Sequence, residues 1–534
     1  MKTYKIIFLF LITVSLLSCQ KDVLNKQPLE EISNDLVWKD VKLANLFLND
    51  VYLGLPGGLG RDLDCSTDLG DDGHEWAAAQ SWNKGDVNPF NDSFDEWGSA
   101  YSQIRKTNLV LENFETIQGD QTARDQLKGQ AYFLRAYFYA ELANFYGGVS
   151  IIDKAQQLGD SLSVSRNTYD ECIAFIIDDL NKAAELLPES WDGSDVGRAT
   201  KGAALALKSR ELLFAASPLH NSSNDVAKWQ AAADAAKAVI DLGIYDLYPD
   251  YYKLFHVDNN QEVIFDIQYA YPTRTQNIEY RTNPQGFGGS YGMTRPSEDL
   301  VECYEMTNGK SISDSASGYN LQDPYIGRDP RFYASILFNG AQWRGKTMET
   351  FVDGLSGPGI QDQYATSGSM TGYYSRKFIS ESNINAYTLD KSNENWILMR
   401  YAEVLLNYAE AELNLGNDAE ARTYINKVRE RVGMPAIPET ESGDNLMARY
   451  RNERKIELSF EEIHFFDLRR WMIAPEVVGS PIHKMHIVKN DDGSFTFDVQ
   501  VMEDRAWRDA FYYLPIPGDE IQKNRNLTQN PGWN

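Results

Sequence analysis

Residues 124–146 read RDQLKGQAYFLRAYFYAELANFY, and this stretch decides the class of fold. Its apolar and aromatic side chains recur at the three- and four-residue spacing of a helix face. Gly147 and Gly148 follow it as a helix stop signal. A second periodic stretch at 99–117 precedes it after a short connection. We therefore expect two helices here that pack against each other as a pair.

The same spacing recurs along much of the chain. Further helices are predicted at 40–55, 168–187, 201–216, 227–242, 396–415, 418–432, 445–460 and 463–471. Several form pairs of similar length, with alanines where two helices would touch. Such pairs cannot bury their apolar faces alone, so they stack into a solenoid. We predict a mostly α fold, an irregular tetratricopeptide-like helical solenoid, because the repeat period of about 34 residues is not kept.

Two long stretches lack the helical pattern. Gly, Ser, Asn, Pro and aromatic residues dominate 57–92 and 249–395, apart from strand-like pieces such as 262–268. Loops this long in a helical scaffold are usually functional or disordered, and their many aromatic residues argue against disorder. We interpret both stretches as insertions in one domain and expect ligand binding there.

The N-terminus has the pattern of a lipoprotein signal peptide. Lysines precede an apolar run at 6–17 that is too short to span a bilayer, and small residues lead into Cys19. We expect residues 1–18 to be removed and Cys19 to carry lipid, which leaves 19–534 as the mature chain. No later segment is apolar for long enough to span a membrane as a helix.

The composition favours a neutral ligand. The chain is 43% hydrophobic and 12% aromatic, which is ample for a large core. Its net charge of −26 argues against nucleic acid and anionic lipid surfaces as partners, since both need a basic surface. Many aromatic residues beside few positive charges are what a sugar-binding protein would show.

Three cysteines remain after Cys19, and they form neither a disulfide framework nor a zinc motif. Their number is odd and their spacing irregular. Cys172 lies in an apolar helical run and is predicted to be a small core residue. A bond between Cys65 and Cys303 stays open.

Several motifs together resemble the SusD/RagB family of lipoproteins. They are AYFLRAYFY at 131–139, NFYGGV at 144–149, RYAEVLLNYAEA at 400–411, RNERKIEL at 451–458, FDLRRW at 466–471, LPIP at 514–517 and QNPG at 529–532. The resemblance covers both ends and most predicted helices, and the two insertions show little of it. The tripeptide at 20–22 is also similar to the export tag of surface lipoproteins in Bacteroidetes-type bacteria.

The resemblance implies a non-catalytic, helical surface lipoprotein of the outer membrane. Family members bind a polysaccharide or a peptide and cap a TonB-dependent, SusC-like transporter. We therefore expect a protein that captures an oligo- or polysaccharide and delivers it to such a transporter. Two alternatives stay open, namely a peptide-binding lid of the same transporter type and a secreted glycoside hydrolase.

The charged stretch at 451–470 has two interpretations. Its carboxylates, among them Glu453, Glu457 and Asp467, could be an acid/base cluster. They alternate with apolar residues and with arginines such as Arg454, however, and arginine–carboxylate pairs commonly hold packed helices together. We predict a scaffold role for this stretch and no catalytic residues in the chain.

The tryptophans of the insertions are the candidate ligand contacts. An indole face can stack on a sugar ring, and a neighbouring polar side chain can bind its hydroxyl groups. We place Trp76, Trp82, Trp343, Asp72, Asn83, Tyr271 and Tyr291 at the site. The alternative is that these tryptophans form a small core within the insertions, and His74 beside them is interpreted as a solvated loop residue.

Tryptophans in the helical stretches are predicted to be core. They are Trp38, Trp97, Trp229, Trp396 and Trp471.

One stretch has the alternating carboxylates of a calcium loop. Asp64, Asp68, Asp72 and Glu75 follow this spacing, but Leu69 stands where such a loop needs glycine. Calcium is therefore a weak candidate, and a polar loop facing the ligand is the simpler interpretation. No histidine pattern indicates zinc, and no other cofactor is predicted.

Overall fold

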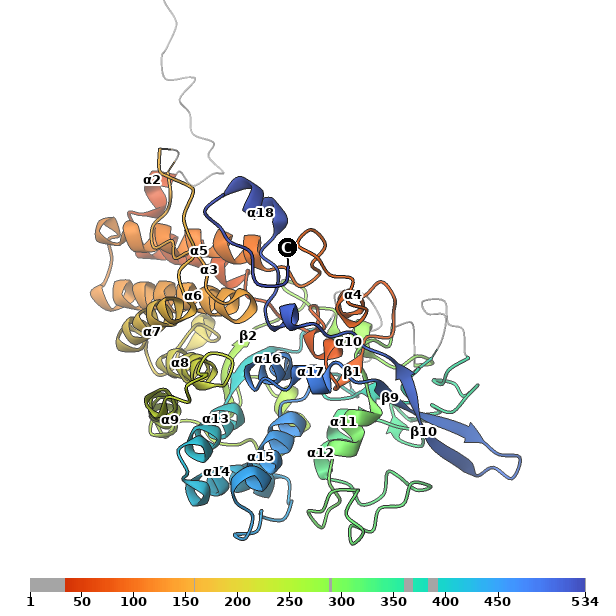
Figure 1. Ribbon diagram of the computed structural model, residues 1–534. Helices are drawn as coiled ribbons and strands as arrows, with labels where there is room; N and C mark the ends of the chain where they lie inside the picture. Colours follow the sequence, from red (N-terminus) through yellow and green to blue (C-terminus); the bar gives the residue numbers. More distant parts are fainter. Residues whose placement is uncertain (1–33, 158, 288–290, 360–367, 383–391, 534) are drawn as a thin grey trace, which may run out of the picture.

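The computed structural model describes residues 34–157, 159–287, 291–359, 368–382 and 392–533. Long helices lie on one side of the molecule, and short helices, strands and loops form the other side (Figure 1). The long helices are α3 (Val41–Tyr52), α5 (Trp97–Glu112), α6 (Gln121–Tyr146), α7 (Tyr169–Leu186), α8 (Lys201–Ala216), α9 (Val226–Ile240), α13 (Tyr401–Asn414), α14 (Asp418–Arg431) and α15 (Gly443–Glu457).

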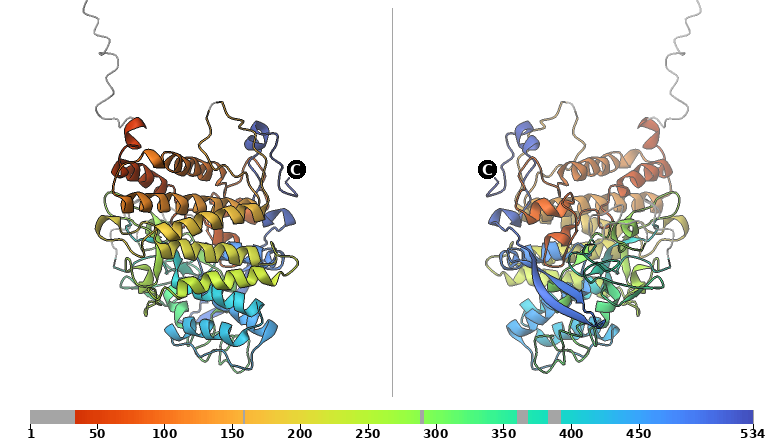
Figure 2. Two further views of the ribbon diagram at one scale, coloured as in Figure 1. Left: turned by 90° about the vertical axis from the view of Figure 1, so that its left-hand side faces the viewer. Right: turned by 90° about the vertical axis from the view of Figure 1, so that its right-hand side faces the viewer.

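These helices pack in chain order. Each helix from α5 to α9 contacts the next, α9 contacts α13 and α13 contacts α14. Figure 2 shows them as successive layers from top to bottom. The predicted helical solenoid is confirmed, and each predicted helix from 40–55 to 227–242 has its counterpart within a few residues. In the described part of the chain, no helix is long and apolar enough to cross a membrane.

Short elements fill the other side. The short helices are α2 (Asn34–Val37), α4 (Ala78–Asn83), α10 (Ile278–Thr282), α11 (Glu298–Cys303), α12 (Pro330–Ser335), α16 (His464–Arg470), α17 (Ala474–Val477) and α18 (Gly518–Lys523). The strands pair antiparallel as β1 (Gly70–Asp71) with β3 (Arg295–Pro296), β2 (Val263–Ile267) with β8 (Trp396–Arg400), β4 (Ile336–Leu337) with β7 (Tyr374–Ser375), β5 (Gln342–Trp343) with β6 (Lys346–Thr347), and β9 (Ile482–Lys489) with β10 (Phe495–Glu503).

Helix α6 is stabilised by a cap at its start, a glycine at its end and an ion pair in its buried part. Asp120 caps its first turn through the amide of Ala123 at 3.2 Å. Gly147 ends it with φ 73°, a conformation that glycine adopts without strain. In its buried part, Arg135 donates to both oxygens of Asp179 on α7, at 2.7 and 2.8 Å. Polar pairing thus ties α6 to the next layer while its aromatic residues fill the core.

The predicted helix at 396–415 is wrong over its first five residues. Trp396–Arg400 forms strand β8, which pairs with β2, the strand-like piece expected near 262–268. Pairing with a distant segment overrides the local helical pattern here. The hairpin of β9 and β10 was not predicted either, although its turn contains Gly493 at φ 86°, a common hairpin signal.

The two insertions meet through strands β1 and β3. Gly70 pairs with Pro296, and the amide of Ser297 donates to the carbonyl of Leu69 at 3.0 Å. A Cβ at Gly70 would lie 2.4 Å from the carbonyl oxygen of Arg295, so only glycine allows this close approach. Residues from two distant parts of the sequence therefore share one side of the molecule.

The five tryptophans predicted to be core residues are buried. Their exposed fractions are 7% for Trp38, 5% for Trp97, 2% for Trp229, 4% for Trp396 and 5% for Trp471. Cys172 is fully buried, as expected. Cys65, Cys172 and Cys303 are free thiols, so Cys65 and Cys303 do not pair.

The charged stretch of α15 is a scaffold, as predicted. Glu457 accepts hydrogen bonds from Arg400 and Arg431 at 2.6 Å and from Arg331 at 3.1 Å. Glu262 bridges Arg400 and Arg431 in turn. Burial alone raises the pKa of Glu457, but the guanidinium groups of Arg431, Arg400 and Arg331 outweigh it and hold that pKa well below its usual range.

A second buried network ties α15 to α16 and α13. Asp467 accepts from Arg454 at 2.7 Å and from Arg470 at 2.8 Å. Arg470 also donates to Glu410 at 2.6 Å, and the indole of Trp471 donates to the same carboxylate at 2.6 Å. The candidate acid/base residues are thus held in ion pairs within the core.

We predict that Glu457→Gln destabilises the protein by about 3–5 kcal/mol, the range for breaking a buried ion pair. The substitution removes a buried carboxylate that Arg400 and Arg431 share. Glu262 remains beside both guanidinium groups and compensates them only in part. Because the pKa of Glu457 is depressed, its contribution is present above pH ~4.3, the ordinary glutamate value, and is lost as the pH falls further. Urea unfolding near neutral pH measures the difference.

The control is Asp178→Asn, which removes an exposed ion pair with Lys182 on α7. Its effect should stay below about 1 kcal/mol. An equally small effect for Glu457→Gln would contradict the scaffold role.

Candidate functional site

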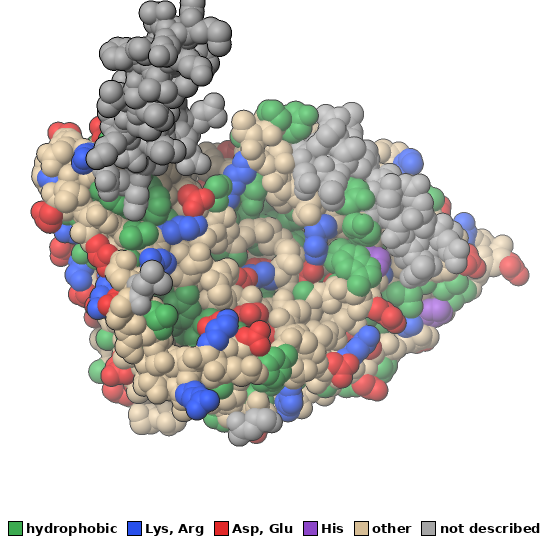
Figure 3. All heavy atoms as spheres, turned by 90° about the horizontal axis from the view of Figure 1, so that it is seen from above, with side chains coloured by type: hydrophobic (Ala, Val, Ile, Leu, Met, Phe, Trp, Pro, Cys, Tyr) green, Lys and Arg blue, Asp and Glu red, His purple; other side chains and the backbone are tan. Residues whose placement is uncertain are grey.

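Four aromatic side chains from the two insertions contact one another in a group that we call the aromatic cluster: His74, Trp76, Tyr280 and Tyr291. Trp76 is exposed, and the other three are half-buried. The rings of His74 and Trp76 stack at 5.1 Å, and Tyr291 meets Trp76 edge-on at 5.6 Å. Tyr280 meets Tyr291 edge-on at 5.3 Å. Trp76 keeps 62% of its surface exposed, so a large aromatic face remains open to solvent. Figure 3 shows one face of the molecule, seen from above the view of Figure 1, where small groups of hydrophobic side chains lie among polar and charged ones.

Hydrogen bonds of β1 and of the loop that follows it hold the aromatic cluster in place. Asp71 accepts from the amide of Gly73 at 2.6 Å and from the side-chain amide of Gln80 at 2.9 Å. Gly73 has φ 80°, and a Cβ there would lie 2.3 Å from the guanidinium carbon of Arg295. The Nε2 atom of His74 lies 3.0 Å from the carbonyl oxygen of Tyr291. The insertion at 57–92 (insertion one) therefore holds Trp76 against the insertion at 249–395 (insertion two) through hydrogen bonds as well as ring contacts.

Trp76 and Tyr291 are the two predicted site residues that the structure brings together. The interpretation of His74 as a solvated loop residue is wrong, because its ring contacts both partners. Tyr280 was missed: it lies in α10, where the sequence shows no feature that separates it from other insertion tyrosines. Tyr271 is 61% exposed, on the turn closed by Ala270 and Arg274.

Trp82 and Trp343 are core residues, which corrects their placement at the site. Trp82 is 3% exposed and packs on Phe94 at 5.4 Å and on Phe511 at 4.9 Å. Trp343 is fully buried in a small separate core with neighbours such as Tyr374. The alternative weighed for them, that the insertions need cores of their own, is what the structure shows.

The two predicted polar contacts are also buried. Asn83 is 2% exposed and donates to the carbonyl of Cys65 at 3.2 Å. Asp72 is fully buried and accepts from the amide of His74 at 3.1 Å. Burial, together with the nearby negative charge of Asp71, raises the pKa of Asp72 to about 8. Both side chains support the loop and have no surface to offer a ligand.

The calcium-like spacing does not form a metal site. Asp64 accepts from the amide of Glu462, whereas Asp68 pairs with Lys455, each through its own contacts in the core. Glu75 is exposed. Among the described residues, no group of three or more His, Cys, Asp or Glu side chains could hold a metal ion. The spacing predicted calcium because alternate positions carry carboxylates, but the chain directs them to different partners.

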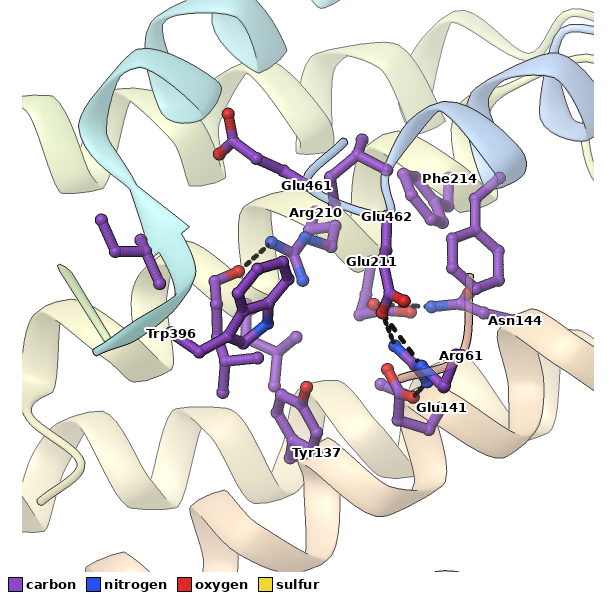
Figure 4. A pocket seen from close by; sticks show the side chains of 16 residues that line it. Arg61, Tyr137, Glu141, Asn144, Arg210, Glu211, Phe214, Trp396, Glu461 and Glu462 are labelled. Carbon is purple, nitrogen blue, oxygen red and sulfur yellow. Dashed lines mark hydrogen bonds and ion pairs between the residues drawn. The ribbon is translucent and has the colours of Figure 1, made fainter. Parts of the chain in front are cut away.

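A charged cavity lies inside the molecule between α6, α8 and the segment before α16 (Figure 4). Arg61 bridges Glu141 at 2.6 Å and Glu462 at 2.8 Å, and Asn144 donates to Glu211 at 3.1 Å. Burial raises the pKa of Glu211 to about 7. The cavity measures about 30 Å³, room for one or two water molecules. Pockets for small ligands measure about 300–1,000 Å³, so these carboxylates have no room for a sugar substrate.

The predicted lipidation site Cys19 and the signal segment 1–18 lie outside the described residues.

Fold and cluster together define a helical scaffold that presents an exposed aromatic surface from its insertions. Residues 261–533 match the SusD family, and residues 60–213 match a family described as starch-binding and associating with the outer membrane. The first match covers half of the chain, so the protein belongs to the SusD family.

Known relatives align with nearly the whole length of the chain. SusD-like protein P2 of Formosa agariphila is 26% identical, with all of both chains covered. A solved SusD-like protein of Bacteroides fragilis is 32% identical, with a TM-score of 0.81 over 95% of this chain and 100% of that one. A SusD-like carbohydrate binding protein of the same organism shares the fold at 24% identity, with a TM-score of 0.79 over 92% of this chain and 99% of that one.

We predict that Asp92→Asn reduces the loss of stability at high pH. Asp92 accepts from the indole of Trp82 at 3.0 Å, and burial raises its pKa to about 7. Because this folded-state pKa lies above the ordinary value of about 3.9, the neutral carboxyl stabilises the fold fully below pH ~4, and this contribution is lost as the pH rises through ~7. Urea unfolding at several pH values between 4 and 9 measures both proteins.

The variant keeps an oxygen acceptor for Trp82 and stays neutral at every pH. Its curve of stability against pH should therefore be flatter than that of the wild type over this range. Parallel curves would show that Asp92 is not held neutral in the folded protein. Asp178→Asn, at an exposed side chain, is the control.

Proposed function

We propose that this protein captures an oligo- or polysaccharide at the cell surface and that the aromatic cluster is the binding surface. The observation that carries the proposal is the exposed indole of Trp76, held between His74 and Tyr291 from two distant parts of the sequence. An exposed tryptophan this firmly placed has no role in the core. Its open face suits the apolar C–H face of a sugar ring, and the neighbouring ring nitrogens and hydroxyl groups suit the sugar hydroxyls.

The cluster is ready to bind before a ligand arrives. Ring contacts and the hydrogen bonds of Asp71 and His74 fix the loop, so little conformational entropy remains to be lost on binding. Tyr271 is exposed in the same insertion as Tyr291 and is a second candidate contact for a longer chain.

Relatives support a carbohydrate ligand. One solved structure of the same fold is a laminarin-binding SusD-like protein, with a TM-score of 0.69 at 22% identity. The family matched at 60–213 is described as starch-binding. A neutral glucan also agrees with the net charge of −26, which disfavours polyanions. Starch and laminarin are therefore the first probes.

The bound glycan is then delivered to a TonB-dependent, SusC-like transporter in the outer membrane, with this protein anchored beside it through lipid on Cys19. The family description of association with the outer membrane supports this arrangement. The acyl chains on Cys19 supply a stable anchor because several chains together bind a membrane far more strongly than one.

Binding without catalysis is the activity we propose. The carboxylates of the charged stretch are held in buried ion pairs, as Glu457 is by Arg400 and Arg431. A glycoside hydrolase needs an acid and a second carboxylate facing one sugar. The peptide-binding alternative would use a polar cleft rather than an exposed indole, and the aromatic cluster favours a glycan over it.

Trp76→Ala should weaken glycan binding by about 2 kcal/mol or more, the loss typical of an aromatic hot spot. That corresponds to roughly thirtyfold in affinity. The melting temperature should change little, because Trp76 is 62% exposed. A glycan array identifies the ligand, and calorimetric titration of both proteins measures the affinities.

Trp82→Ala is the matched control within the same insertion. Trp82 is 3% exposed, so its truncation should lower the melting temperature strongly. If Trp76→Ala binds the glycan as tightly as the wild type, the aromatic cluster is not the binding surface.

Replacement of Cys19 by Ala should release the protein from the outer membrane or leave it unlipidated in the periplasm, because the acyl chains are then missing. Fractionation in cells that lack the transporter measures the anchor alone. Membrane association that persists in such cells would contradict lipid anchoring through Cys19.

A further inference from the structure

Figure 1 places helices α5 and α18 at the end of the molecule away from the β9–β10 hairpin. A second hollow is lined by α5, by residues between 150 and 156, by Leu162 and Val164, and by residues of α18 and the segment after it. We call it the α5 groove. Its volume is about 530 Å³, within the range of about 300–1,000 Å³ for small-ligand pockets. Half-buried side chains, Tyr101, Ile152 and Val164, supply apolar surface above the buried Trp97, Ile104 and Leu527. Leu162 at the edge is 64% exposed. An exposed leucine beside an open apolar hollow is a place where a ligand would bury surface.

Gly98 keeps the groove open. It lies in the first turn of α5, where a glycine costs helix stability relative to alanine. A Cβ at Gly98 would have no atom within 4 Å, and its backbone is not in the left-handed region. Neither a close contact nor a turn therefore requires glycine here. The consequence of the missing side chain is free space on the groove side of the helix.

The polar groups of the groove floor already have partners inside the protein. The hydroxyl of Tyr101 donates to the carbonyl of Ser150 at 2.7 Å. The amide of Asn108 donates to the carbonyl of Ile152 at 2.8 Å, and its oxygen accepts from Arg135 at 2.9 Å. A sugar needs several free donors and acceptors, which this floor does not offer. The groove therefore suits an apolar ligand and differs in chemistry from the aromatic cluster.

Positive charge gathers at the edge of the groove. Arg105, Lys154 and Lys523 line it, against a single carboxylate, Glu520, which pairs with Lys523 at 2.7 Å. In the whole chain, by contrast, 77 acidic residues outnumber 51 basic ones. Lys154 has no carboxylate at ion-pair distance in the described part of the chain. An anionic group on the ligand would find complementary charge here.

We propose that the α5 groove binds a single-chain amphiphile with an anionic head, of the chemistry of a medium-chain fatty acid. The hydrocarbon tail lies along Tyr101, Ile152 and Val164. The carboxylate meets Lys154 and Arg105 at the edge. The source of the molecule is the free amphiphile in solution and not a bilayer surface, because the groove is recessed between three segments.

Calorimetric titration with hexanoate, octanoate and decanoate, each below its micelle concentration, tests the proposal on the full protein. Each added methylene that enters the groove should raise the affinity about fourfold. Octanoate should bind more tightly than octan-1-ol, which lacks the charge. Lys154→Gln should weaken octanoate binding a few-fold and leave octan-1-ol unchanged, as expected for an ion pair at an exposed edge.

Gly98→Leu should abolish decanoate binding, because its side chain fills the space the tail would occupy. Gly60→Leu is the matched control, since a Cβ at Gly60 also meets no atom within 4 Å. Melting curves show whether both variants fold, and Lys154→Gln provides a second test if Gly98→Leu does not. Trp76→Ala should bind decanoate like the wild type, which separates this proposal from glycan binding.

Three results would overturn the proposal. One is no saturable binding of decanoate by the wild type, and another is unchanged binding by a folded Gly98→Leu variant. The third is association with anionic phospholipid vesicles but not with free decanoate, which would make this side of the molecule a membrane-contact surface instead.

Discussion

The buried carboxylate of Glu457 is the interaction on which the arrangement of the molecule depends. It joins Arg431 at the end of α14, Arg400 at the end of β8 and Arg331 in α12. Insertion two has only short helices and strands, and its backbone joins the helical side through the pairing of β2 with β8. Buried ion pairs add to this attachment, because an arginine displaced from its carboxylate would remain buried and uncompensated.

Insertion one is attached to the same helices from another direction. Asp68 accepts from Lys455 on α15 at 2.6 Å and lies 2.8 Å from the Nε2 atom of His464 on α16. Arg505 donates to the carbonyl of Gly70 at 2.8 Å. With both insertions tied to α15 and its neighbour, strands β1 and β3 can pair, and Trp76 comes to lie beside Tyr291. The exposed aromatic cluster is thus a consequence of charge pairing in the interior.

The helices could be predicted from the sequence because their signals are local. Periodicity and a glycine stop place the end of α6 at Tyr146, as observed. The strand at Trp396–Arg400 could not, because its partner β2 lies more than a hundred residues earlier. Trp76 and Trp82 stand six residues apart in equally polar surroundings, yet Trp82 is buried by Phe511 from the far end of the chain. Only the tertiary fold distinguishes the exposed indole from the buried one.

The aromatic cluster and the α5 groove differ in the property that selects a ligand. At the cluster, Trp76 presents a flat face beside polar ring atoms, an arrangement suited to the proposed ligand, which has both apolar faces and hydroxyl edges. In the groove, the polar groups of Tyr101 and Asn108 are hydrogen-bonded to backbone carbonyls of the protein. The interior of the groove therefore offers apolar contact, and charge lies only at its edge. Because the two sites share no residue, selection on one leaves the other free to change. A scaffold fixed by interior ion pairs can therefore carry separate ligand chemistries at its surface.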